Sequence, residues 1–451
     1  MERREPVLPR STDAVVVVPG IMGSELMDQS GNVQWGLKPS VLAHAWLTKT
    51  LDILHVTDDD MAGGCRLRPT RLLRVPGYMP FLGGLEPYTG LLRRVAETTA
   101  DPRAVAEFPY DWRLSFEYNA PFLVKCCEEH LESWRAVVQA ERKGDPADVR
   151  LVVVAHSMGG LITRYATQKL DLSALLRQVI TLGTPFYGAV KGVQMLATGE
   201  GAPVPREVAR RLALTCPGVF DLLPRYRSVL TTDGLRLLTV EDIAAIGGSA
   251  ELAADASQRW EKLGLAAGDR SGSAVRHLAV VGTEQPTVQS VELEAGEATF
   301  LESLAGINHA GDSTVYRQAA ALGDQPAFVL PQKHGSLAKT PEALAFVADK
   351  LVGADTKPPL GTRLVGADIP DMAVAGRPVK LWVTGNDIDP IGVSVKSTDI
   401  ETGIPTTWHT NTRVDGAMQY THSGLPPGLH RIQVQAGGYS PVTDMILVTA
   451  P

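Results

Sequence analysis

Cysteine is scarce in this chain of 451 residues, and positive charge is not in excess. Four cysteines are too few for a disulfide scaffold of this size, and none belongs to a Cys-x-x-Cys pair. The net charge is -7, from 43 basic and 50 acidic residues, and no basic stretch stands out. Because phosphate contacts need clustered Lys and Arg, this balance argues against nucleic acid as a partner.

Long apolar runs are also missing. No run reaches the roughly 18 apolar residues that a membrane-spanning helix needs, and the first residues lack the apolar core of a secretory signal. We therefore expect a cytoplasmic protein. The hydrophobic content of 44% is enough to bury a large core, which excludes a disordered chain.

Buried strands alternate with amphipathic helices over most of the chain. Unbroken apolar, largely β-branched runs predict strands buried on both faces at 14–18, 151–155, 178–182, 277–281 and 327–330. Apolar residues at helical spacing predict helices over about 118–141, after Met158, and from Thr340-Pro341 to Gly353. Cys126 and Cys127 border the first apolar stripe and are interpreted as small core residues. The alternation predicts an α/β fold with a mostly parallel sheet.

Two long stretches, about 30–95 and 186–275, do not fit the alternation, and insertions of this length usually form lids or caps over a site. The first domain is predicted to span residues 1–354, followed by a Pro-containing linker at 355–361. Short segments with period-two alternation then predict a small antiparallel β-sandwich, immunoglobulin-like or similar, over 362–451.

The sharpest motif is Leu-Val-Val-Val-Ala-His-Ser-Met-Gly-Gly at 151–160. A buried strand leads through small residues into a serine and then a helix, which is the setting of the nucleophile elbow of α/β-hydrolases. Ala155 replaces the usual first glycine of that motif and keeps the volume small. We therefore predict an α/β-hydrolase fold with Ser157 as nucleophile, and His156 as a structural or pocket residue.

A serine at its ordinary pKa needs a positioned base. In this fold the chain order is serine, acid, histidine, so the base lies beyond the last strand. His334 follows the strand at 327–330 and precedes a capped helix, which makes it the predicted base. His309 is the rival, and His277, at the start of a strand, is interpreted as structural.

The acid is expected after the fourth strand, where it would hold the imidazole tautomer. Asp312, in Gly-Asp-Ser-Thr-Val, is the candidate because the hydroxyls after it can fix a buried carboxylate. Glu284 lies nearer the strand end and is the alternative. Spacing alone does not separate the two.

Two backbone N–H donors must face the oxyanion of the tetrahedral intermediate. One is predicted at Met158, directly after the nucleophile. The second is predicted at Ile21, in the glycine-rich turn after the first strand that also contains Gly20 and Gly23. An ordinary strand-ending turn is the alternative interpretation of that segment.

With these residues assembled, the chain resembles the lecithin:cholesterol acyltransferase family over roughly 12–352. The resemblance depends on Val-Pro-Gly-Ile-Met-Gly-Ser-Glu-Leu at 18–26, Pro-Tyr-Asp-Trp-Arg at 109–113, Ala-His-Ser-Met-Gly-Gly at 155–160, Leu-Gly-Thr-Pro-Phe-Tyr-Gly at 182–188, Leu-Leu-Pro at 222–224 and Gly-Asp-Ser-Thr-Val at 311–315. It implies a triad of Ser157, Asp312 and His334, with oxyanion donors at Ile21 and Met158. It also implies that Asp111, Trp112 and Arg113 brace the site wall.

The resemblance further implies an acyl hydrolase or O-acyltransferase that acts on lipid esters through an acyl-serine. No cofactor and no metal are expected, since the cluster of Asn386, Asp387 and Asp389 is interpreted as a polar turn. Contact of a lid with a membrane surface, through Trp46-Leu47 or residues 78–82, is weighed equally with packing under the lid. The alternatives are a small-ester esterase on the same fold, and a binding protein with an inactive hydrolase core.

Overall fold

The structure, a computed structural model, describes residues 10–36, 51–64, 66–73, 88–201, 205–263, 275–294, 296–322, 327–356, 365–370, 372–385, 392–399, 402–414, 417–436 and 441–449. The apolar segments that contain Trp46-Leu47 and residues 78–82 lie outside these ranges, as do Cys65, most of the predicted linker and the Asn386–Asp389 cluster.

A parallel six-stranded sheet forms the centre of the first domain. Its strands are ordered β13 (Ala327–Leu330), β10 (Arg276–Gly282), β7 (Leu176–Leu182), β6 (Leu151–His156), β1 (Ala14–Val18) and β5 (Val105–Glu107). Every neighbouring pair is parallel. The five strands expected from apolar runs are confirmed, whereas β5 was not predicted from the sequence.

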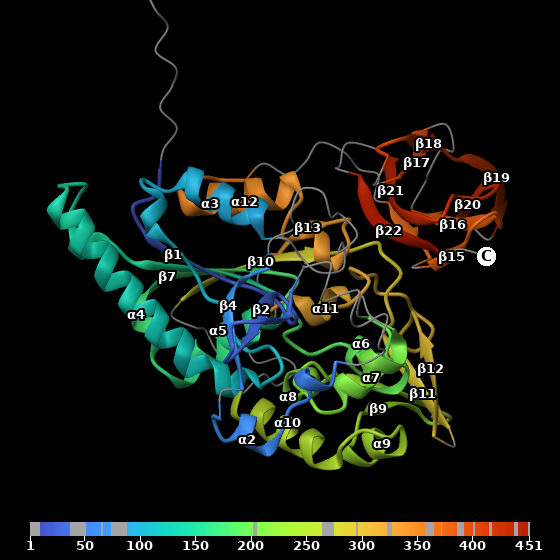
Figure 1. Cartoon of the computed structure of the whole chain (residues 1–451), viewed down its shortest axis with the longest axis horizontal. Coiled ribbons are helices and arrows are strands. Elements are labelled where there is room, and N and C mark those ends of the chain that lie inside the picture. Colours follow the sequence, from blue (N-terminus) through green and yellow to red (C-terminus); the bar gives the residue numbers. More distant parts are fainter. Residues whose placement is uncertain are drawn as a thin grey trace, which may run out of the picture.

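Helices cover both faces of this sheet (Figure 1). On one face lie α4 (Phe116–Ala140) and α5 (Met158–Lys169), and on the other lie α3 (Thr89–Thr98) and α12 (Pro341–Leu351). Alternate residues of β1 enter the two cores, Val16 and Val18 on the α4 side and Val15 and Val17 on the α3 side. Burial of each such valine contributes about 1.5–3 kcal/mol, which explains why an unalternating run forms this strand.

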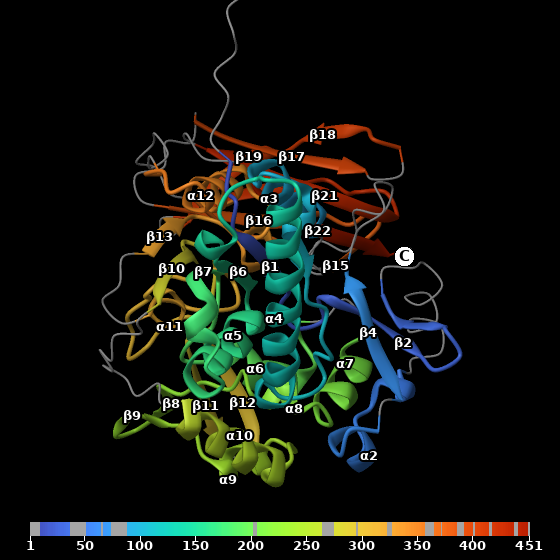
Figure 2. The ribbon, with the colours of Figure 1, turned by 90° about the vertical axis from the view of Figure 1, so that its left-hand side faces the viewer.

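The insertions contribute to two further sheets, of which the one with β9, β11 and β12 lies near α9 in Figures 1 and 2. One joins β2 (Ser24–Asp28), β3 (Val33–Trp35) and β4 (Leu67–Leu72), next to η1 (Asp52–Leu54) and α2 (Asp58–Met61). The other pairs β8 (Arg227–Thr231) and β9 (Gly234–Leu237) with β11 (Ser290–Glu294) and β12 (Glu297–Leu301). The second insertion therefore includes residues beyond β10, which the sequence did not indicate.

The remaining elements of the first domain are short helices. They are η3 (Pro102–Ala104), η4 (Pro146–Asp148), η5 (Leu172–Leu175), α6 (Val190–Thr198), α7 (Arg206–Ala213), α8 (Pro217–Phe220), α9 (Val240–Ala245), α10 (Ala250–Leu263), α11 (Arg317–Ala320) and η6 (His334–Ser336). None of the described helices combines the length and the apolar composition required to cross a bilayer.

Residues beyond 365 form a two-sheet sandwich with its own core. One sheet contains β14 (Gly366–Asp368), β16 (Val379–Thr384), β20 (Ala417–His422) and β19 (His409–Val414). The other contains β15 (Met372–Val374), β22 (Val442–Thr449), β21 (Gly428–Ala436), β17 (Val393–Asp399) and β18 (Pro405–Thr407). Side chains of both sheets, including Leu381 and Ile432, form one buried cluster. The expected sandwich is confirmed, except that β15 and β22 are parallel.

Candidate active site

Ser157 occupies the turn between β6 and α5. Its backbone angles are φ 50° and ψ -126°, a conformation that side-chain-bearing residues rarely adopt. The turn is held by two hydrogen bonds, from Ser157 N–H to the Leu182 carbonyl (2.9 Å) and from Gly160 N–H to the Ser157 carbonyl (3.0 Å). The serine therefore stands at the carboxyl end of a central strand and at the first turn of a helix, as the motif predicts.

His334 meets this serine from the loop after β13. Its Nε2 lies 2.8 Å from Ser157 Oγ, and its Nδ1 lies 2.8 Å from Asp312 Oδ2. A carboxylate only accepts hydrogen bonds, so Nδ1 carries a proton and donates it to Asp312. In the neutral ring this leaves the Nε2 lone pair to accept the serine hydroxyl.

Asp312 is fully buried and is fixed from several sides. Its Oδ1 accepts hydrogen bonds from the backbone N–H groups of Thr314 (3.0 Å) and Val315 (2.7 Å). Its carbonyl accepts from the N–H of His334 at 2.7 Å, which ties the two loops together. Backbone amides, rather than the hydroxyls considered from the sequence, thus orient the carboxylate toward His334.

The alternative residues lie in other surroundings. The Glu284 carboxylate accepts a hydrogen bond from the Thr283 hydroxyl at 3.2 Å. The His309 ring contacts the Gln318 amide at 3.2 Å and packs near Tyr316. His277 is buried beside Phe186, and burial lowers its pKa to about 3, so it stays neutral.

The turn after β1 lies directly against the serine. A Cβ on Gly20 would stand 2.9 Å from both His156 Nδ1 and Ser157 Cβ, so only glycine allows this approach. Gly23 closes the turn, donating its N–H to the Gly20 carbonyl at 3.0 Å. Ile21 lies inside this turn, and Met158 is the first residue of α5, where a backbone N–H has no partner within the helix.

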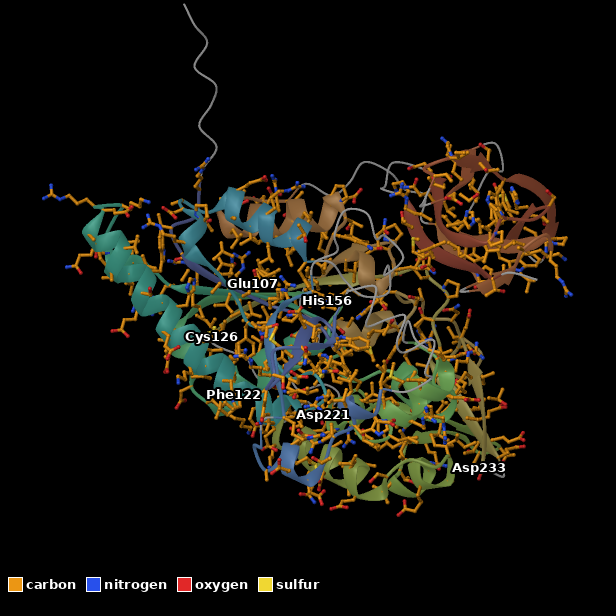
Figure 3. The ribbon with its side chains drawn as sticks, viewed as in Figure 1. Glu107, Phe122, Cys126, His156, Asp221 and Asp233 are labelled. Atoms are coloured by element: carbon orange, nitrogen blue, oxygen red, sulfur yellow. The ribbon has the colours of Figure 1, made fainter. Side chains whose placement is uncertain are left out.

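A tyrosine that the sequence did not single out connects this turn to His156. Tyr88 Oη accepts the N–H of Gly20 at 2.8 Å and lies 3.1 Å from His156 Nδ1. His156 Nε2 in turn lies 3.4 Å from the carbonyl of His334, and Figure 3 places His156 well inside the molecule. His156 is thus a structural neighbour of the site, and Tyr88 contacts it across 68 residues of sequence.

The Asp111–Arg113 segment, which the resemblance places in the site wall, is buried. Arg113 is 1% exposed and makes paired hydrogen bonds to Asp111, at 3.0 and 2.7 Å. Burial opposes its charge, but the carboxylates of Asp111 and Asp60 outweigh this effect and raise its pKa. The carbonyl of Trp112 and the side-chain end of Met158 both border Gly218.

The three cysteines in the described ranges are not candidates for the chemistry. Cys127 is buried on α4 and Cys126 is half-buried at its edge, as expected for small packing residues (Figure 3). Burial raises the pKa of the Cys216 thiol to about 12, so this thiol stays protonated near neutral pH. Within the described ranges no group of three or more His, Cys, Asp or Glu side chains gathers in a metal-binding arrangement.

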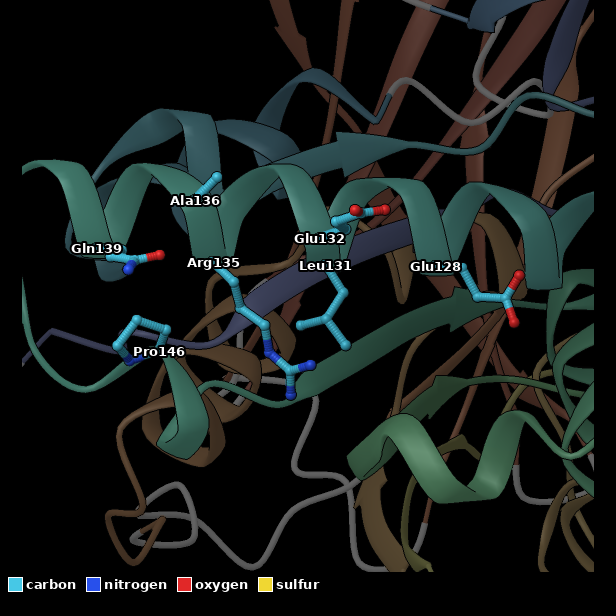
Figure 4. Close-up of a pocket in the computed structure, with 7 residues that line it drawn as sticks. All are labelled: Glu128, Leu131, Glu132, Arg135, Ala136, Gln139 and Pro146. Atoms are coloured by element: carbon cyan, nitrogen blue, oxygen red, sulfur yellow. The ribbon is translucent and has the colours of Figure 1, made fainter.

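A hollow of about 310 Å³ lies elsewhere, between α4 and η4 (Figure 4). Its walls include the charged side chains of Glu128, Glu132 and Arg135. The Arg135 guanidinium donates a hydrogen bond to the Val149 carbonyl at 2.7 Å. Its charged lining and its place on the outer helix separate this hollow from the Ser157 site.

Comparison with known proteins finds one family model that matches part of the chain. Residues 59–261 match the sequence model of the family described as lecithin:cholesterol acyltransferase. The matched range contains Ser157 and the Asp111–Arg113 segment, whereas Ile21, Asp312 and His334 lie outside it.

Several relatives match parts of the chain. Human lysosomal phospholipase A and acyltransferase is 31% identical over 100 residues, which cover 22% of this chain and 22% of the relative. The dog protein of the same name is 26% identical over 220 residues, covering 42% and 52%. An uncharacterized protein of Saccharomyces cerevisiae is 28% identical over 172 residues, covering 38% and 23%. The chain thus spans between about a fifth and about half of the length of these relatives.

Two solved structures also match. The crystal structure of the Tle4–Tli4 complex has a TM-score of 0.47 at 14% identity, covering 75% of this chain and 96% of that chain. Mature lipase BlEst2 of Bacillus licheniformis has a TM-score of 0.34 at 13% identity, covering 78% and 94%. Both scores are too low to carry an argument about this chain.

The family model and the relatives agree with the enzyme class that the resemblance implies, an acyltransferase or a lipase-type ester hydrolase. The resemblance to the lecithin:cholesterol acyltransferase family is thereby confirmed over residues 59–261.

Proposed function

We propose that this protein is a serine-dependent acyl hydrolase or O-acyltransferase that acts on lipid esters. The observation that carries the proposal is the hydrogen-bonded series from Ser157 Oγ through the His334 ring to Asp312, with both distances at 2.8 Å. This arrangement supplies a nucleophile, a base and an orienting acid in the geometry that acyl transfer requires. The family match and the names of the relatives support the lipid ester as substrate class.

In the first half-reaction Ser157 Oγ attacks the ester carbonyl carbon while its proton passes to His334 Nε2. Asp312, which accepts the hydrogen bond from Nδ1–H, stabilises the imidazolium that forms. The tetrahedral intermediate then collapses. The C–O bond to the leaving alcohol breaks, and the alcohol oxygen takes the proton from Nε2. An acyl-serine remains.

In this mechanism, the N–H groups of Ile21 and Met158 bind the oxyanion of the tetrahedral intermediate. The turn that carries Ile21 is held against Ser157 by Gly20, and Met158 follows the serine directly. Fixed donors of this kind need no reorganisation when charge develops, and each is typically worth about 2.7–4 kcal/mol of barrier.

The second half-reaction transfers the acyl group to an acceptor. His334 Nε2 removes a proton from water or from an alcohol, whose oxygen attacks the acyl carbon, and Ser157 leaves with the proton. Water as acceptor makes the protein a hydrolase, and an alcohol makes it a transferase. Access of water to the acyl-serine decides between them.

The test uses a fluorophosphonate probe together with a panel of phospholipids and acylglycerols, with and without a long-chain alcohol. We expect wild type to be labelled at Ser157 and to release fatty acid, or to form a new ester when the alcohol is present. Ser157→Ala should abolish labelling. Asp312→Asn should keep the fold but lower turnover by about 10³- to 10⁴-fold, because the imidazole loses its tautomer.

The panel also separates the alternatives. Turnover of short-chain esters only, with no lipid hydrolysed, would favour a small-ester esterase. A folded wild type that the probe does not label, even in detergent, would contradict the catalytic proposal and favour a binding protein. Location in the cytoplasm remains a separate prediction, checked by fractionation of cells that express the tagged chain.

A further inference from the structure

We propose that the C-terminal β-sandwich is a positioning element of the active site, because it contacts both loops that carry Asp312 and His334. This inference rests on the function proposed above. The sandwich lies beside the β13 end of the central sheet (Figure 1). Two sets of its contacts with the first domain lie next to these two residues in the chain or in space.

The first contact is made by a buried glutamine of the first domain. Gln285 is 2% exposed, and its side-chain amide donates to the Val365 carbonyl at 3.0 Å and accepts the Ala367 N–H at 3.3 Å. The amide thereby pairs with the backbone around β14 as a neighbouring strand would. The Gln285 N–H donates to the Gly311 carbonyl at 2.9 Å, and Gln285 pairs with Asp312 in a parallel bridge. One residue thus connects the sandwich to the acid loop.

The close fit at this contact depends on a glycine. A Cβ on Gly366 would collide with the carbonyl oxygen of Glu284, the residue before Gln285. The first strand of the sandwich therefore lies directly on the backbone that follows β10. Such close approach leaves the acid loop little freedom to shift.

The second contact is an ion pair between Lys333, the residue before His334, and the sandwich. Lys333 Nζ bonds the carboxylate of Asp444 on β22, and both side chains are largely covered, at 17% and 22% exposure. The Gln332 side-chain amide also donates to the carbonyl of Pro441, at 3.5 Å. Lys333 caps η6, the short helix that begins at His334. The sandwich thus contacts the base loop at the two residues that precede His334.

The two contacts act on loops that are themselves connected, because the His334 N–H donates to the Asp312 carbonyl at 2.7 Å. General-base catalysis needs the imidazole within about 0.5 Å of its productive place. A loosened sandwich contact would therefore slow the chemical step without changing how substrate binds. Lys333, Asp444 and Gln285 are assigned as positioning residues, which touch neither substrate nor the reacting atoms.

The test uses the full chain with Lys333→Met, Asp444→Asn, the double variant, and the exchange Lys333→Asp with Asp444→Lys. Fluorophosphonate labelling is resolved into the maximal rate of inactivation and the probe's half-saturating concentration. We expect each single variant to lower the maximal rate about three- to tenfold, with the double variant no worse than either single. The exchange should recover part of the loss, and half-saturation should stay unchanged. Hydrogen exchange in a peptide over 331–337 should accelerate in the single variants.

One control variant lies in the same sandwich, and a further variant removes the Gln285 contact. Lys396→Ala, an exposed lysine on β17 two strands from β22, should change nothing. Gln285→Ala should lower the maximal rate as the ion-pair variants do. Unchanged labelling and unchanged hydrogen exchange in Lys333→Met and Asp444→Asn would overturn the proposal, as would a double variant whose loss is the product of the single losses. If wild type is not labelled at all, the proposed function fails, and exchange over 331–337 alone decides whether the sandwich holds the loop.

Discussion

At the scale of single residues, Ser157 shows how backbone strain places a side chain. A non-glycine residue at φ 50°, ψ -126° costs about 1–3 kcal/mol, so surrounding bonds must enforce it. Here the neighbouring strand β7 supplies the acceptor for its N–H, and α5 supplies the donor for its carbonyl. The strain turns the hydroxyl out of the sheet and toward His334.

Tyr88 is predicted to hold the turn that contains Ile21. In Tyr88→Phe the N–H of Gly20 loses its acceptor, and a buried unsatisfied donor costs about 1–3 kcal/mol. We expect the rate of fluorophosphonate labelling to fall roughly tenfold. Labelling kinetics measured beside thermal unfolding check this.

A matched control separates the turn from general stability. Tyr165→Phe also removes a hydroxyl from a hydrogen bond, in this case to Glu117 at 2.6 Å. Its unfolding temperature should fall while its labelling rate stays that of wild type. Equal loss of labelling in both variants would show that Tyr88 has no particular role at the turn.

His277 is predicted to make the fold sensitive to acid. Its pKa is lowered by burial from 6.5 to about 3, so between these values the unfolded chain binds a proton that the folded chain does not. Stability contributed by the neutral ring is therefore present above pH 6.5 and is lost as pH falls toward about 3. The slope is at most about 1.4 kcal/mol per pH unit.

Urea unfolding at a series of pH values tests this prediction. His277→Leu should flatten the dependence of unfolding free energy on pH between 6.5 and 4, relative to wild type. Parallel curves for the two proteins would mean that other groups carry the acid sensitivity.

At the scale of elements, an ion network attaches the α2 segment to the core. Asp60 at the end of a capping box is 3% exposed and bonds Arg66 Nε at 3.2 Å. It also lies 3.6 Å from Arg113, which donates to the Leu54 carbonyl at 3.2 Å. The residues of α2 and η1 are thus connected to Arg113 by charge and by a backbone hydrogen bond.

Asp60→Asn is predicted to release this segment. Arg113 keeps Asp111 as a partner and the Arg66 side chain is 36% exposed. We therefore expect a loss of about 1–3 kcal/mol in the free energy of unfolding, the usual cost of removing one partner of a buried hydrogen bond. The pKa of Asp60 is lowered from 3.8, because Arg66, Thr57 and Arg113 outweigh burial. The stabilisation is therefore present above pH 3.8 and is lost as pH falls through the lowered value.

Urea unfolding and hydrogen exchange over 52–66 measure the effect. Asp58→Asn on the exposed side of the same turn is the control and should change little. An Asp60→Asn protein with the exchange and stability of wild type would contradict the role of the network.

The same scale shows which elements sequence patterns miss. The apolar stripe Leu123, Cys127, Leu131, Trp134 and Val138 predicts α4 within two residues of its observed ends. Strand β5 is three residues long and half-buried, so it offers no pattern of its own and exists because it pairs with β1 at the sheet edge. Strands β8 and β11 pair across about sixty residues, which no local period can indicate.

At the scale of the whole molecule, we propose the domain division expected from the sequence, 1–354, 355–361 and 362–451. Ile432→Ala in the sandwich core should lower the unfolding temperature of the sandwich, with a cost of about 2–5 kcal/mol. The cores of the first domain are separate from the sandwich core, so the unfolding temperature of the first domain should not change. Calorimetry of the full chain measures both.

Leu123→Ala on α4 provides the reciprocal case, since this side chain is fully buried in the other core. It should lower the unfolding temperature of the first domain, with a similar loss in its free energy of unfolding. Two variants that move a single common transition together would show that the chain unfolds as one unit and that the division is wrong.

Features that depend on neighbouring residues can be predicted from the chain alone. The β-branched run, the small residues and the serine before a helix specify the Ser157 turn, because strand, turn and helix are set by contacts within a few residues. The order of the main strands and the alternating strands of the sandwich follow from similar local patterns. The same patterns placed His334 and Asp312 in the loops where they lie.

Which side chains meet depends on how the elements pack in three dimensions. Asp312 rather than Glu284 lies against His334 Nδ1, because amides of its own loop turn the carboxylate inward. Tyr88 and Gln285 reach the site from segments with no motif, and their contacts span 68 and 82 residues. Such contacts depend on the packing of whole elements, whose side-chain complementarity leaves no local pattern in the chain.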